Sequence, residues 1–315
     1  MLRKNAYICG VKLGKKMKYA VIGVGGVGGY YGGKIAHAGQ EVCFLLHSDY
    51  NYVCEHGLQV NSCKGSFLVN PVHAYRNPAY LPVCDVVLVA LKTVNNGKLP
   101  ELLSHVVGPD TLVVLIQNGL GMEEDLQAAM PDLQIAAATA FICSAKTGPG
   151  VVSHMDYGSL TIANYSCRDQ TKIDALVAEL NEAGIETHEA EYKLARWRKA
   201  VWNMPFNGMT VALNTSTNAL LANSHTRALI REQMLEVIGA AKACGVEGLE
   251  PSFADQMIAS TDAMTPYKPS MKLDYDYGRP MEIDYLYTRP ISMAAAAGYD
   301  MRQLKMLEAE LRFLS

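Results

Sequence analysis

The sequence predicts an α/β protein in which an N-terminal doubly wound sheet is followed by an all-helical C-terminal domain. Short apolar runs rich in β-forming residues alternate with helical segments up to about residue 188. Two of these runs, 85–92 and 111–119, are apolar almost throughout, as in strands that are covered on both faces. From residue 189 onward the remaining segments have the period of helices. We therefore expect a first domain over residues 17–188 and a second over residues 189–315.

The elements of the first domain follow from local pattern. The run "KYAVIG" predicts a strand over 18–23, and glycines and a helical stretch follow it. "EVCFLL" predicts the second strand over 41–46. Alternation with a glycine predicts a hairpin at the sheet edge over 150–163. Amphipathic periodicity predicts helices at 121–130 and 168–184, the second ended by Gly184.

The second domain is predicted to contain helices only. Helical periodicity is found in the segments 189–202, 225–245, 252–261 and 303–314. Pro205 and Pro290 lie within helical patterns, and we expect each to kink or interrupt its helix because proline lacks an N–H and crowds the preceding turn.

Composition limits the partners of the chain. Its 315 residues are enough for two domains of ordinary size, and its net charge is -3. An acidic balance argues against a nucleic-acid or anionic-membrane partner. No apolar run approaches the roughly 20 residues that a membrane span needs, so we expect no membrane association.

The cysteines and histidines indicate neither disulfides nor zinc. There is no C-x-x-C pair and no Cys/His cluster, and several cysteines lie in apolar runs. We expect free, mostly buried thiols in a reducing compartment, which points to the cytoplasm, and no metal site. The eight cysteines are Cys9, Cys43, Cys54, Cys63, Cys84, Cys143, Cys167 and Cys244.

Residues 1–16 are expected to stand outside the folded domain. The segment is basic but lacks the apolar core and cleavage site of a signal peptide. "MKYAVIG" from Met17 resembles a natural domain start, so residues 1–16 are interpreted as a disordered tail or the result of a mis-assigned start codon.

The glycine-rich segment "GVGGVG" is the first functional signal. It places Gly23, Gly25 and Gly28 in the pattern G-x-G-x-x-G, after a predicted strand and at the start of a predicted helix. In that context the pattern predicts a dinucleotide site of the Rossmann type. Gly23 would allow the tight turn, Gly25 would let the pyrophosphate approach the backbone at the helix N-terminus, and Gly28 would let helix pack on strand.

The end of the second strand normally distinguishes NAD from NADP. An acidic residue there binds the ribose hydroxyls of NAD. Here the first position is His47, followed by Ser48 and Asp49. The absence of an acid at the first position favours NADP, although no arginine stands there to hold a 2′-phosphate, so NAD remains possible.

Two further strand ends carry polar side chains. Lys92 ends the strand 85–92, and Asn118 lies at the end of the strand 111–119. In an open α/β sheet, ligands bind outside the carboxyl ends of the strands. Both residues are therefore expected beside the nicotinamide end of a dinucleotide.

A polar stripe marks the first helix of the second domain. In "RWRKAVWNMPFN", Lys199, Asn203 and Asn207 follow one another at steps of four residues. Each step leaves a net rotation of only about 40°, so the three side chains point in roughly one direction. An exposed helix face is the ordinary explanation of such a stripe. A stripe that faces a cleft would instead hold a polar ligand.

These motifs together resemble the ketopantoate reductase (2-dehydropantoate 2-reductase) family, over essentially the whole chain from residue 17. The resemblance rests on "GVGGVGGYYGGKIAHAGQEV", "DVVLVALK", "QNGLG", "RWRKAVWNMPFN", "KPSMKLD" and "MEIDY", which occur in the order and at about the spacing of that family.

The resemblance implies the NADPH-dependent reduction of 2-dehydropantoate to pantoate in the pantothenate pathway. It implies that Lys199 is the proton donor and that Asn118, Asn203, Asn207, Asn218, Ser270 and Glu282 bind substrate. It implies that Lys92, Asn118 and Glu282 also lie beside the cofactor. The match at Asn218 depends on the register of the alignment.

Departures from the family pattern keep alternatives open. The basic residue expected for the 2′-phosphate is replaced by His47. Pro205 lies between the two asparagines, whereas the family commonly has its proline after the second one, and Pro290 stands where the family helix usually continues. A related 2-oxo acid or opine-type dehydrogenase is one alternative, and a non-catalytic dinucleotide-binding regulator is another. The apolar helical domain also permits a homodimer.

Overall fold

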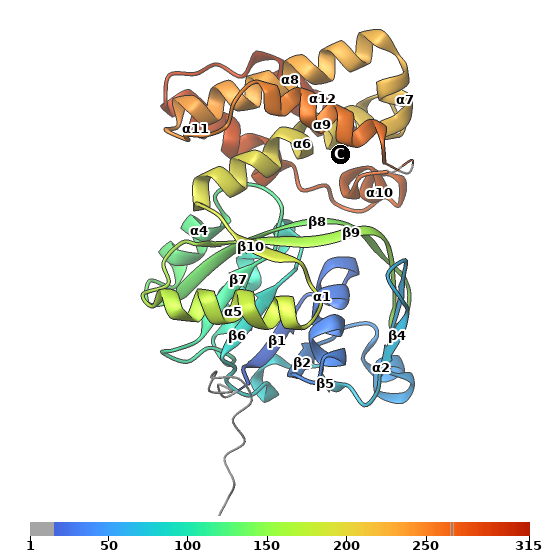
Figure 1. Ribbon diagram of the computed structural model, residues 1–315, viewed down its shortest axis with the longest axis vertical. Helices are drawn as coiled ribbons and strands as arrows, with labels where there is room; N and C mark the ends of the chain where they lie inside the picture. The colour runs from blue at the N-terminus through green and yellow to red at the C-terminus, as the bar shows by residue number, and fades with distance from the viewer. Residues whose placement is uncertain (1–15, 265, 267) are drawn as a thin grey trace, which may run out of the picture.

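The computed structural model describes residues 16–264, 266 and 268–315. Residues 1–15, and Cys9 among them, lie outside the described residues, so the expectations for them stay predictions. The α/β architecture with a following helical region is confirmed (Figure 1).

Among the described residues, the first part of the chain forms a ten-stranded sheet with helices on both faces. Its strands are β1 (Lys18–Ile22), β2 (Glu41–Leu45), β3 (Leu58–Ser62), β4 (Phe67–Val69), β5 (His73–Tyr75), β6 (Val86–Val89), β7 (Leu112–Leu115), β8 (Gln134–Gly148), β9 (Val151–Asn164) and β10 (Thr187–Glu189). Its helices are α1 (Gly26–His37), α2 (Tyr50–His56), α3 (Leu99–Leu103), α4 (Met122–Ala129) and α5 (Gln170–Glu182), with short 3₁₀ turns η1 (Pro78–Tyr80) and η2 (Thr93–Lys98).

The strand order positions the functional end of the sheet. It runs β4-β3-β9-β8-β7-β6-β1-β2-β5, with β10 paired to β9. β1, β2, β5, β6, β7 and β8 are parallel to their neighbours in this series, so the carboxyl ends of these strands meet at one edge. Alternate side chains of β1 enter two separate cores, Tyr19 and Val21 on one face and Ala20 and Ile22 on the other.

The predicted hairpin over 150–163 is wrong. These residues form one long strand, β9, which pairs antiparallel with β8. The actual hairpin therefore consists of β8 and β9, and its turn precedes Val151. β9 lies between β8 and β3 and is not at the sheet edge. The glycine taken as the turn, Gly158, has a positive φ of 107° beside a register shift, so it belongs to a bulge within the strand.

The helical region contains no strand after Glu189 among the described residues. Its helices are α6 (Tyr192–Ala212), α7 (Thr217–Ala222), α8 (Ser224–Ala243), α9 (Ser252–Asp262), α10 (Ser270–Asp276), α11 (Arg289–Ala296) and α12 (Arg302–Leu314), with a π-helical turn η3 (Asp284–Thr288). α6 is the central element, since its apolar side chains lie in one core with those of α8, α11 and α12. Figure 1 shows this region above the sheet, with α6 rising from the sheet into it.

The two prolines behave differently. α6 continues through Pro205, so no interruption is present there. Tyr287 donates a hydrogen bond from its hydroxyl to the carbonyl of Met204 over 2.5 Å, which ties this part of α6 to the π-helical turn. At Pro290 the regular helix does restart, because the π-helical turn ends at Thr288 and Pro290 occupies the first turn of α11.

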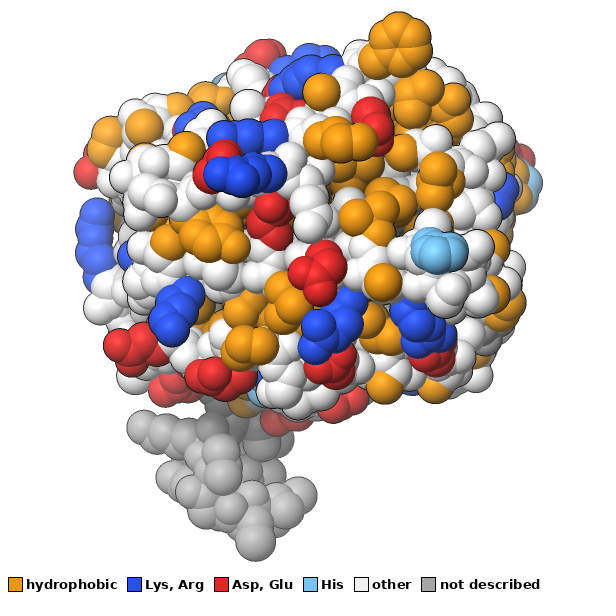
Figure 2. Space-filling model, turned by 90° about the horizontal axis from the view of Figure 1, so that it is seen from above, with side chains coloured by type: hydrophobic (Ala, Val, Ile, Leu, Met, Phe, Trp, Pro, Cys, Tyr) orange, Lys and Arg blue, Asp and Glu red, His pale blue; other side chains and the backbone are white. Residues whose placement is uncertain are grey.

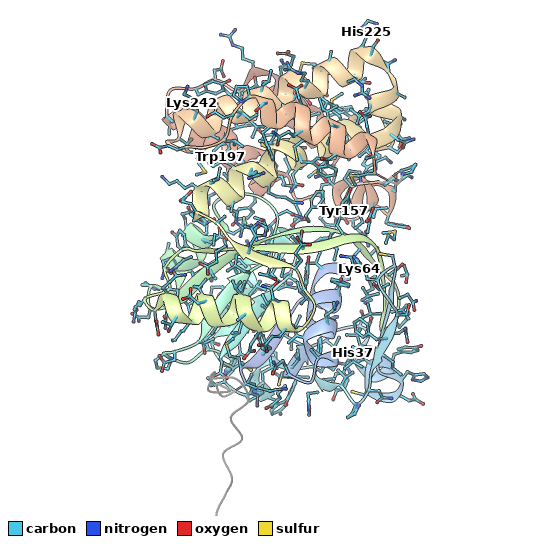
Figure 3. All side chains as sticks on the ribbon, viewed as in Figure 1. His37, Lys64, Tyr157, Trp197, His225 and Lys242 are labelled. Atoms are coloured by element: carbon cyan, nitrogen blue, oxygen red, sulfur yellow. The ribbon has the colours of Figure 1, made fainter. Side chains whose placement is uncertain are left out.

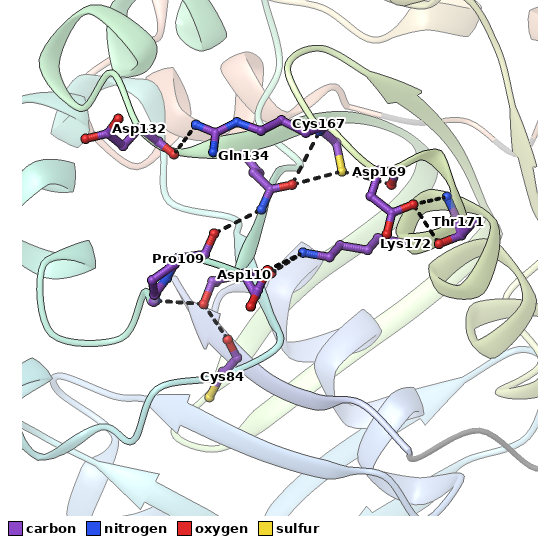
Figure 4. A network of polar contacts seen from close by, with 12 residues as sticks. Cys84, Pro109, Asp110, Asp132, Gln134, Cys167, Asp169, Thr171 and Lys172 are labelled. Atoms are coloured by element: carbon purple, nitrogen blue, oxygen red, sulfur yellow. Dashed lines mark hydrogen bonds and ion pairs between the residues drawn. The ribbon is translucent and has the colours of Figure 1, made fainter.

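Polar contacts hold α5 against the loops of the sheet (Figure 4). Asp169 caps the helix by accepting from the Thr171 amide over 3.0 Å, and Lys172 donates to the carbonyl of Asp110 over 2.9 Å. At the other end Gly184 has a φ of 73°, which confirms the predicted stop.

The described cysteines are all free, and Cys43, Cys84, Cys143 and Cys167 are buried. In the described part of the chain, no three His, Cys, Asp or Glu side chains gather in a way that could hold a metal ion. None of the helices in that part is long and apolar enough to cross a membrane.

Candidate active site

The glycine loop between β1 and α1 has the geometry of a dinucleotide cradle. Gly23 has a φ of 98°, and a Cβ there would lie 2.5 Å from the amide nitrogen of Leu91. A Cβ at Gly28 would lie 2.2 Å from the carbonyl oxygen of Gly23, so this glycine allows α1 to pack on the strand. Around Gly25, in contrast, no heavy atom of the described residues lies within 4 Å of the Cβ position. That open space is where a pyrophosphate would contact the backbone.

A cavity of about 670 Å³ opens beside this loop. Its lining combines the glycine loop, the ends of β2 and β6, and charged side chains from several elements. The polar and charged residues among them are His47, Ser48, Asp49, Arg76, Lys92, Asn95, Lys98, Glu101 and Lys146. Gly23, Gly25, His47 and Lys92 are thus brought together as expected, and the donors and volume fit a dinucleotide.

Lys92 joins the cofactor cavity to the helical region. Its ammonium pairs with the carboxylate of Asp274 on α10, which is fully buried and also forms an ion pair with Nε of Arg279 at 3.0 Å. Adjacent Thr93 donates from its amide over 2.7 Å and from its hydroxyl over 2.9 Å to Oε1 of Glu282. The Lys92–Asp274 ion pair and the hydrogen bonds from Thr93 to Glu282 hold the segment after β6 against the helical region.

Glu282 lies behind this turn and not in the wall of the cavity. It is buried, and burial raises the pKa of its carboxyl although the Thr93 hydrogen bonds and Lys92 oppose that rise. Both hydrogen bonds use Oε1, and among the described residues Oε2 accepts none.

A second, smaller pocket of about 80 Å³ lies between the sheet and the helical region. Lys199, Asn203 and Asn207 all line it, so the stripe on α6 faces a pocket and not solvent. The pocket is also lined by Asn118 from the end of β7 and by Ser270 from the start of α10. The structure thus gathers five of the predicted site residues.

Lys199 is a desolvated cation without a carboxylate partner in the described part of the chain. Its Nζ lies 5.4 Å from the ring centroid of Phe141 and 5.9 Å from that of Trp202. The residue keeps some exposed surface, but its ammonium is enclosed by protein. Burial lowers the pKa of Lys199 to about 8. An ammonium with this pKa can give up a proton near neutral pH.

The asparagines on the stripe connect three elements. Asn203 donates from Nδ2 to Oδ1 of Asn118 over 3.3 Å. Asn207 donates from Nδ2 to the carbonyl of Asn203 over 2.9 Å, and its Oδ1 accepts from the amide of Met271 over 3.2 Å. Asn207 therefore fixes the start of α10, which is what places the neighbouring Ser270 in the pocket.

Asn218 is not brought into this group, which corrects the expectation that it binds substrate there. α6 ends at Ala212, and Asn214 adopts a positive φ of 47°, so the chain changes direction before α7. Asn218 is exposed on α7 and accepts a hydrogen bond from Ser216 over 2.7 Å. The buried position at this point is Thr217.

Residues of β8 and β9 complete the pocket wall and were missed from the sequence. Phe141 and Tyr157 lie with ring centroids 4.3 Å apart, and Cys143 lines the same wall. Tyr157 has a φ of 62°, a conformation that a non-glycine residue adopts at a cost, beside the register shift between the two strands. In Figure 3 it lies where β9 faces the helical region. Only the pairing of β8 with β9, which the sequence did not reveal, brings these side chains here.

The chain matches two family models that together cover most of its length. Residues 19–166 match the ketopantoate reductase PanE/ApbA model, and residues 191–315 match the model of the C-terminal part of the same family. The 2-dehydropantoate 2-reductase of Nostoc sp. is 41% identical over 303 residues, which cover 94% of this chain and 95% of that protein.

Solved structures agree with the sequence matches. The crystal structure of 2-dehydropantoate 2-reductase from Geobacter metallireducens GS-15 superposes with a TM-score of 0.92 at 37% identity, covering 95% of this chain and 100% of that one. The corresponding structure from Methylococcus capsulatus has a TM-score of 0.85 at 32% identity and covers 94% and 96% of the two chains.

Proposed function

Because the chain belongs to the ketopantoate reductase family, we propose that it reduces 2-dehydropantoate to pantoate, with NADPH as the preferred cofactor and Lys199 as the proton donor. The observation that carries the proposal is the position of Lys199. It is a desolvated cation without a carboxylate partner among the described residues, and it shares one pocket with three asparagines and two serines. A keto acid offers that pocket a carbonyl oxygen and polar groups that amides and hydroxyls can bind.

Lys199 has a defined task in this reaction. A bound dihydronicotinamide supplies the hydride, and negative charge then develops on the former carbonyl oxygen. The Lys199 ammonium stabilises that charge and transfers a proton to the same oxygen. Its lowered pKa favours the transfer, and its position on the rigid helix α6 keeps the donor in place.

The neighbouring residues orient the substrate. Asn203 and Asn118 present amide groups from α6 and β7 toward the pocket, and Ser270 presents a hydroxyl from α10. Phe141 and Tyr157 form an apolar wall that excludes water from the developing charge. Glu282 would accept a ligand hydroxyl with Oε2, and Lys92 would contact the cofactor once its pair with Asp274 rearranges.

Two other proposals concern the molecule as a whole. We expect the division at residue 188 to separate a dinucleotide-binding domain from a substrate domain, since β10 ends at Glu189 and α6 begins at Tyr192.

A homodimer would use the helical region, where Met306 and Phe313 on α12 are 65% and 88% exposed. Figure 2 shows apolar side chains gathered on one side of the outer face of that region. The free thiols among the described cysteines agree with a cytoplasmic location.

One assay separates the proposal from its alternatives. Cofactor oxidation is followed at constant NADPH or NADH with 2-dehydropantoate, with its analogue lacking the hydroxymethyl group, and with pyruvate. We expect the highest kcat/KM with 2-dehydropantoate and NADPH. A higher kcat/KM with another 2-oxo acid would assign the chain to a related dehydrogenase. Binding of dinucleotide without turnover of any keto acid would identify a regulator.

A further inference from the structure

The cofactor cavity contains an arginine that does not come from the end of β2. β5 pairs with β2 in parallel, with Leu45 opposite Tyr75, and the amide of Leu46 donates to the carbonyl of Tyr75 over 2.8 Å. Arg76 follows directly, so the pairing places it beside the end of β2, where His47 and Ser48 stand. No arginine stands at the end of β2 itself, as expected, but the neighbouring strand β5 supplies one to the same cavity.

Arg76 is free to bind a ligand. It is exposed, it lines the cavity, and among the described residues it forms no hydrogen bond or ion pair. Its charge acts on the Tyr50 hydroxyl, where it opposes the rise in the pKa of that group. A guanidinium without a partner at the mouth of a nucleotide cavity is suited to a phosphate, which it can bind with two parallel hydrogen bonds.

The acidic residue at the end of β2 is already occupied. Asp49 is 7% exposed and accepts from the Gly150 amide over 2.9 Å, from the Ser48 hydroxyl over 2.9 Å and from the Lys146 ammonium over 2.6 Å. Burial alone would raise the pKa of Asp49, but Lys146 and these hydrogen bonds lower it overall. Its carboxylate is thus charged and satisfied, and it is not available to the ribose hydroxyls in the manner of an NAD enzyme.

Lys146 adds a second cation at the same place. It comes from the β8–β9 hairpin, whose end reaches the start of α2, and it lines the cavity with a third of its side chain exposed. Figure 1 shows the hairpin extending over α1 toward α2. The other charged residues of the cavity, Lys92, Lys98 and Glu101, follow β6, which is three strands away from β5 in the sheet.

We infer that Arg76 and Lys146 together form the binding site for the 2′-phosphate of NADPH, in place of a basic residue at the end of β2. The inference rests on the proposed preference for NADPH. It assigns the contact with the 2′-phosphate to Arg76, which follows β5 and lies 29 residues further along the chain than His47. It also gives Asp49 the role of positioning Lys146, and not that of binding ribose.

The test uses two probes that differ only in the 2′-phosphate, adenosine 2′,5′-bisphosphate and adenosine 5′-monophosphate. Affinities for both are measured by calorimetry on the full chain and on the Arg76→Gln, Lys146→Gln and Arg168→Gln variants. Arg168→Gln is the matched control, because this substitution removes the same charge from an exposed site near Pro131 and Ser166. NADPH- and NADH-dependent turnover of 2-dehydropantoate is measured in parallel.

We expect the parent to bind the 2′,5′-bisphosphate at least tenfold more tightly than the monophosphate. Arg76→Gln should reduce that ratio about 10- to 100-fold, as expected for loss of a hydrogen-bonded charge pair, and leave monophosphate affinity within twofold. Lys146→Gln should reduce it in the same direction, and Arg168→Gln should leave it unchanged.

Two results would overturn the inference, and they can be told apart. If the parent distinguishes the two probes but Arg76→Gln retains the ratio within twofold, or Arg168→Gln reduces it equally, the 2′-phosphate is bound elsewhere and the NADPH preference stands. If the parent does not distinguish the probes and uses NADH as well as NADPH, the proposed cofactor preference fails together with the inference.

Discussion

The side chains of Asn203 and Asn118 meet over 3.3 Å, and this contact joins the polar stripe of α6 to the carboxyl end of β7. Lys199 precedes Asn203 by one helical turn and therefore stands over the same edge of the sheet, where ligands of α/β proteins bind. The contact is long for an amide hydrogen bond. A substrate oxygen can therefore replace Asn118 as the acceptor at little cost.

The glycine loop gives a prediction with an internal control. Gly25→Ala should leave the thermal stability unchanged, because no described atom lies within 4 Å of the new methyl group. It should weaken NADPH binding at least tenfold, because the methyl occupies the space of the pyrophosphate. Gly28→Ala should instead lower the melting temperature, since its methyl meets the carbonyl of Gly23. Calorimetry and thermal denaturation check both, and unchanged nucleotide affinity in Gly25→Ala would remove the dinucleotide assignment.

The residue at the end of β2 is expected to modulate cofactor choice. His47 lines the cofactor cavity and carries no permanent charge. His47→Arg should add a guanidinium beside Arg76 and increase the NADPH/NADH ratio of kcat/KM several-fold. Steady-state kinetics with both cofactors measure this ratio. A ratio that does not change would show that position 47 does not contact the 2′-phosphate.

Glu282→Gln separates charge from shape. The amide oxygen of glutamine can still accept from Thr93, so the fold should persist. Burial raises the pKa of the Glu282 carboxyl, so the buried charge destabilises the folded chain at neutral pH. The variant should therefore be as stable as the parent or more stable at pH 7. Its KM for substrate or cofactor should rise at least tenfold, and wild-type kinetics would exclude Glu282 from ligand binding.

The lowered pKa of Lys199 predicts a pH dependence with a definite sign. The proton donor must carry its proton, and the folded chain loses it above about pH 8. kcat/KM for reduction should be constant from pH 6 to 7.5 and then fall towards tenfold per pH unit above pH 8. Lys199→Arg should have low activity without this fall, because the guanidinium stays protonated. A parent profile that is flat to pH 10 would contradict the assignment.

Much of the sheet and the stripe could be predicted from the sequence, because both depend on local patterns. The runs at 85–92 and 111–119 are apolar almost throughout, and they contain β6 and β7. β8 was missed because its alanines and polar residues do not resemble a typical strand. The predicted hairpin failed for the same reason, since β8 is the true partner of β9.

The missing parts of the site depend on contacts between distant segments. Arg76 and His47 are brought together only by the pairing of β5 with β2. Phe141 and Tyr157 meet only across the bulge between β8 and β9. Asn218 was misplaced because the left-handed residue Asn214 breaks the continuation of α6, which spacing alone does not reveal. None of these contacts has a signal within its own segment.

The most direct test of the account is the turnover of 2-dehydropantoate by Lys199→Met with saturating NADPH, with melting temperature and NADPH affinity measured on the same protein. Methionine fills similar space and removes the Lys199 cation, whose pKa burial lowers from 10.5 to about 8. Because that buried charge destabilises the folded chain at pH 7, the variant should melt at no lower temperature than the parent. NADPH affinity should change by less than twofold, and kcat should fall by about 10² to 10⁴, the contribution of one positioned acid. A variant that folds, binds NADPH and turns over within about threefold of the parent, a difference below 1 kcal/mol in barrier, would contradict the assignment of Lys199 as the proton donor.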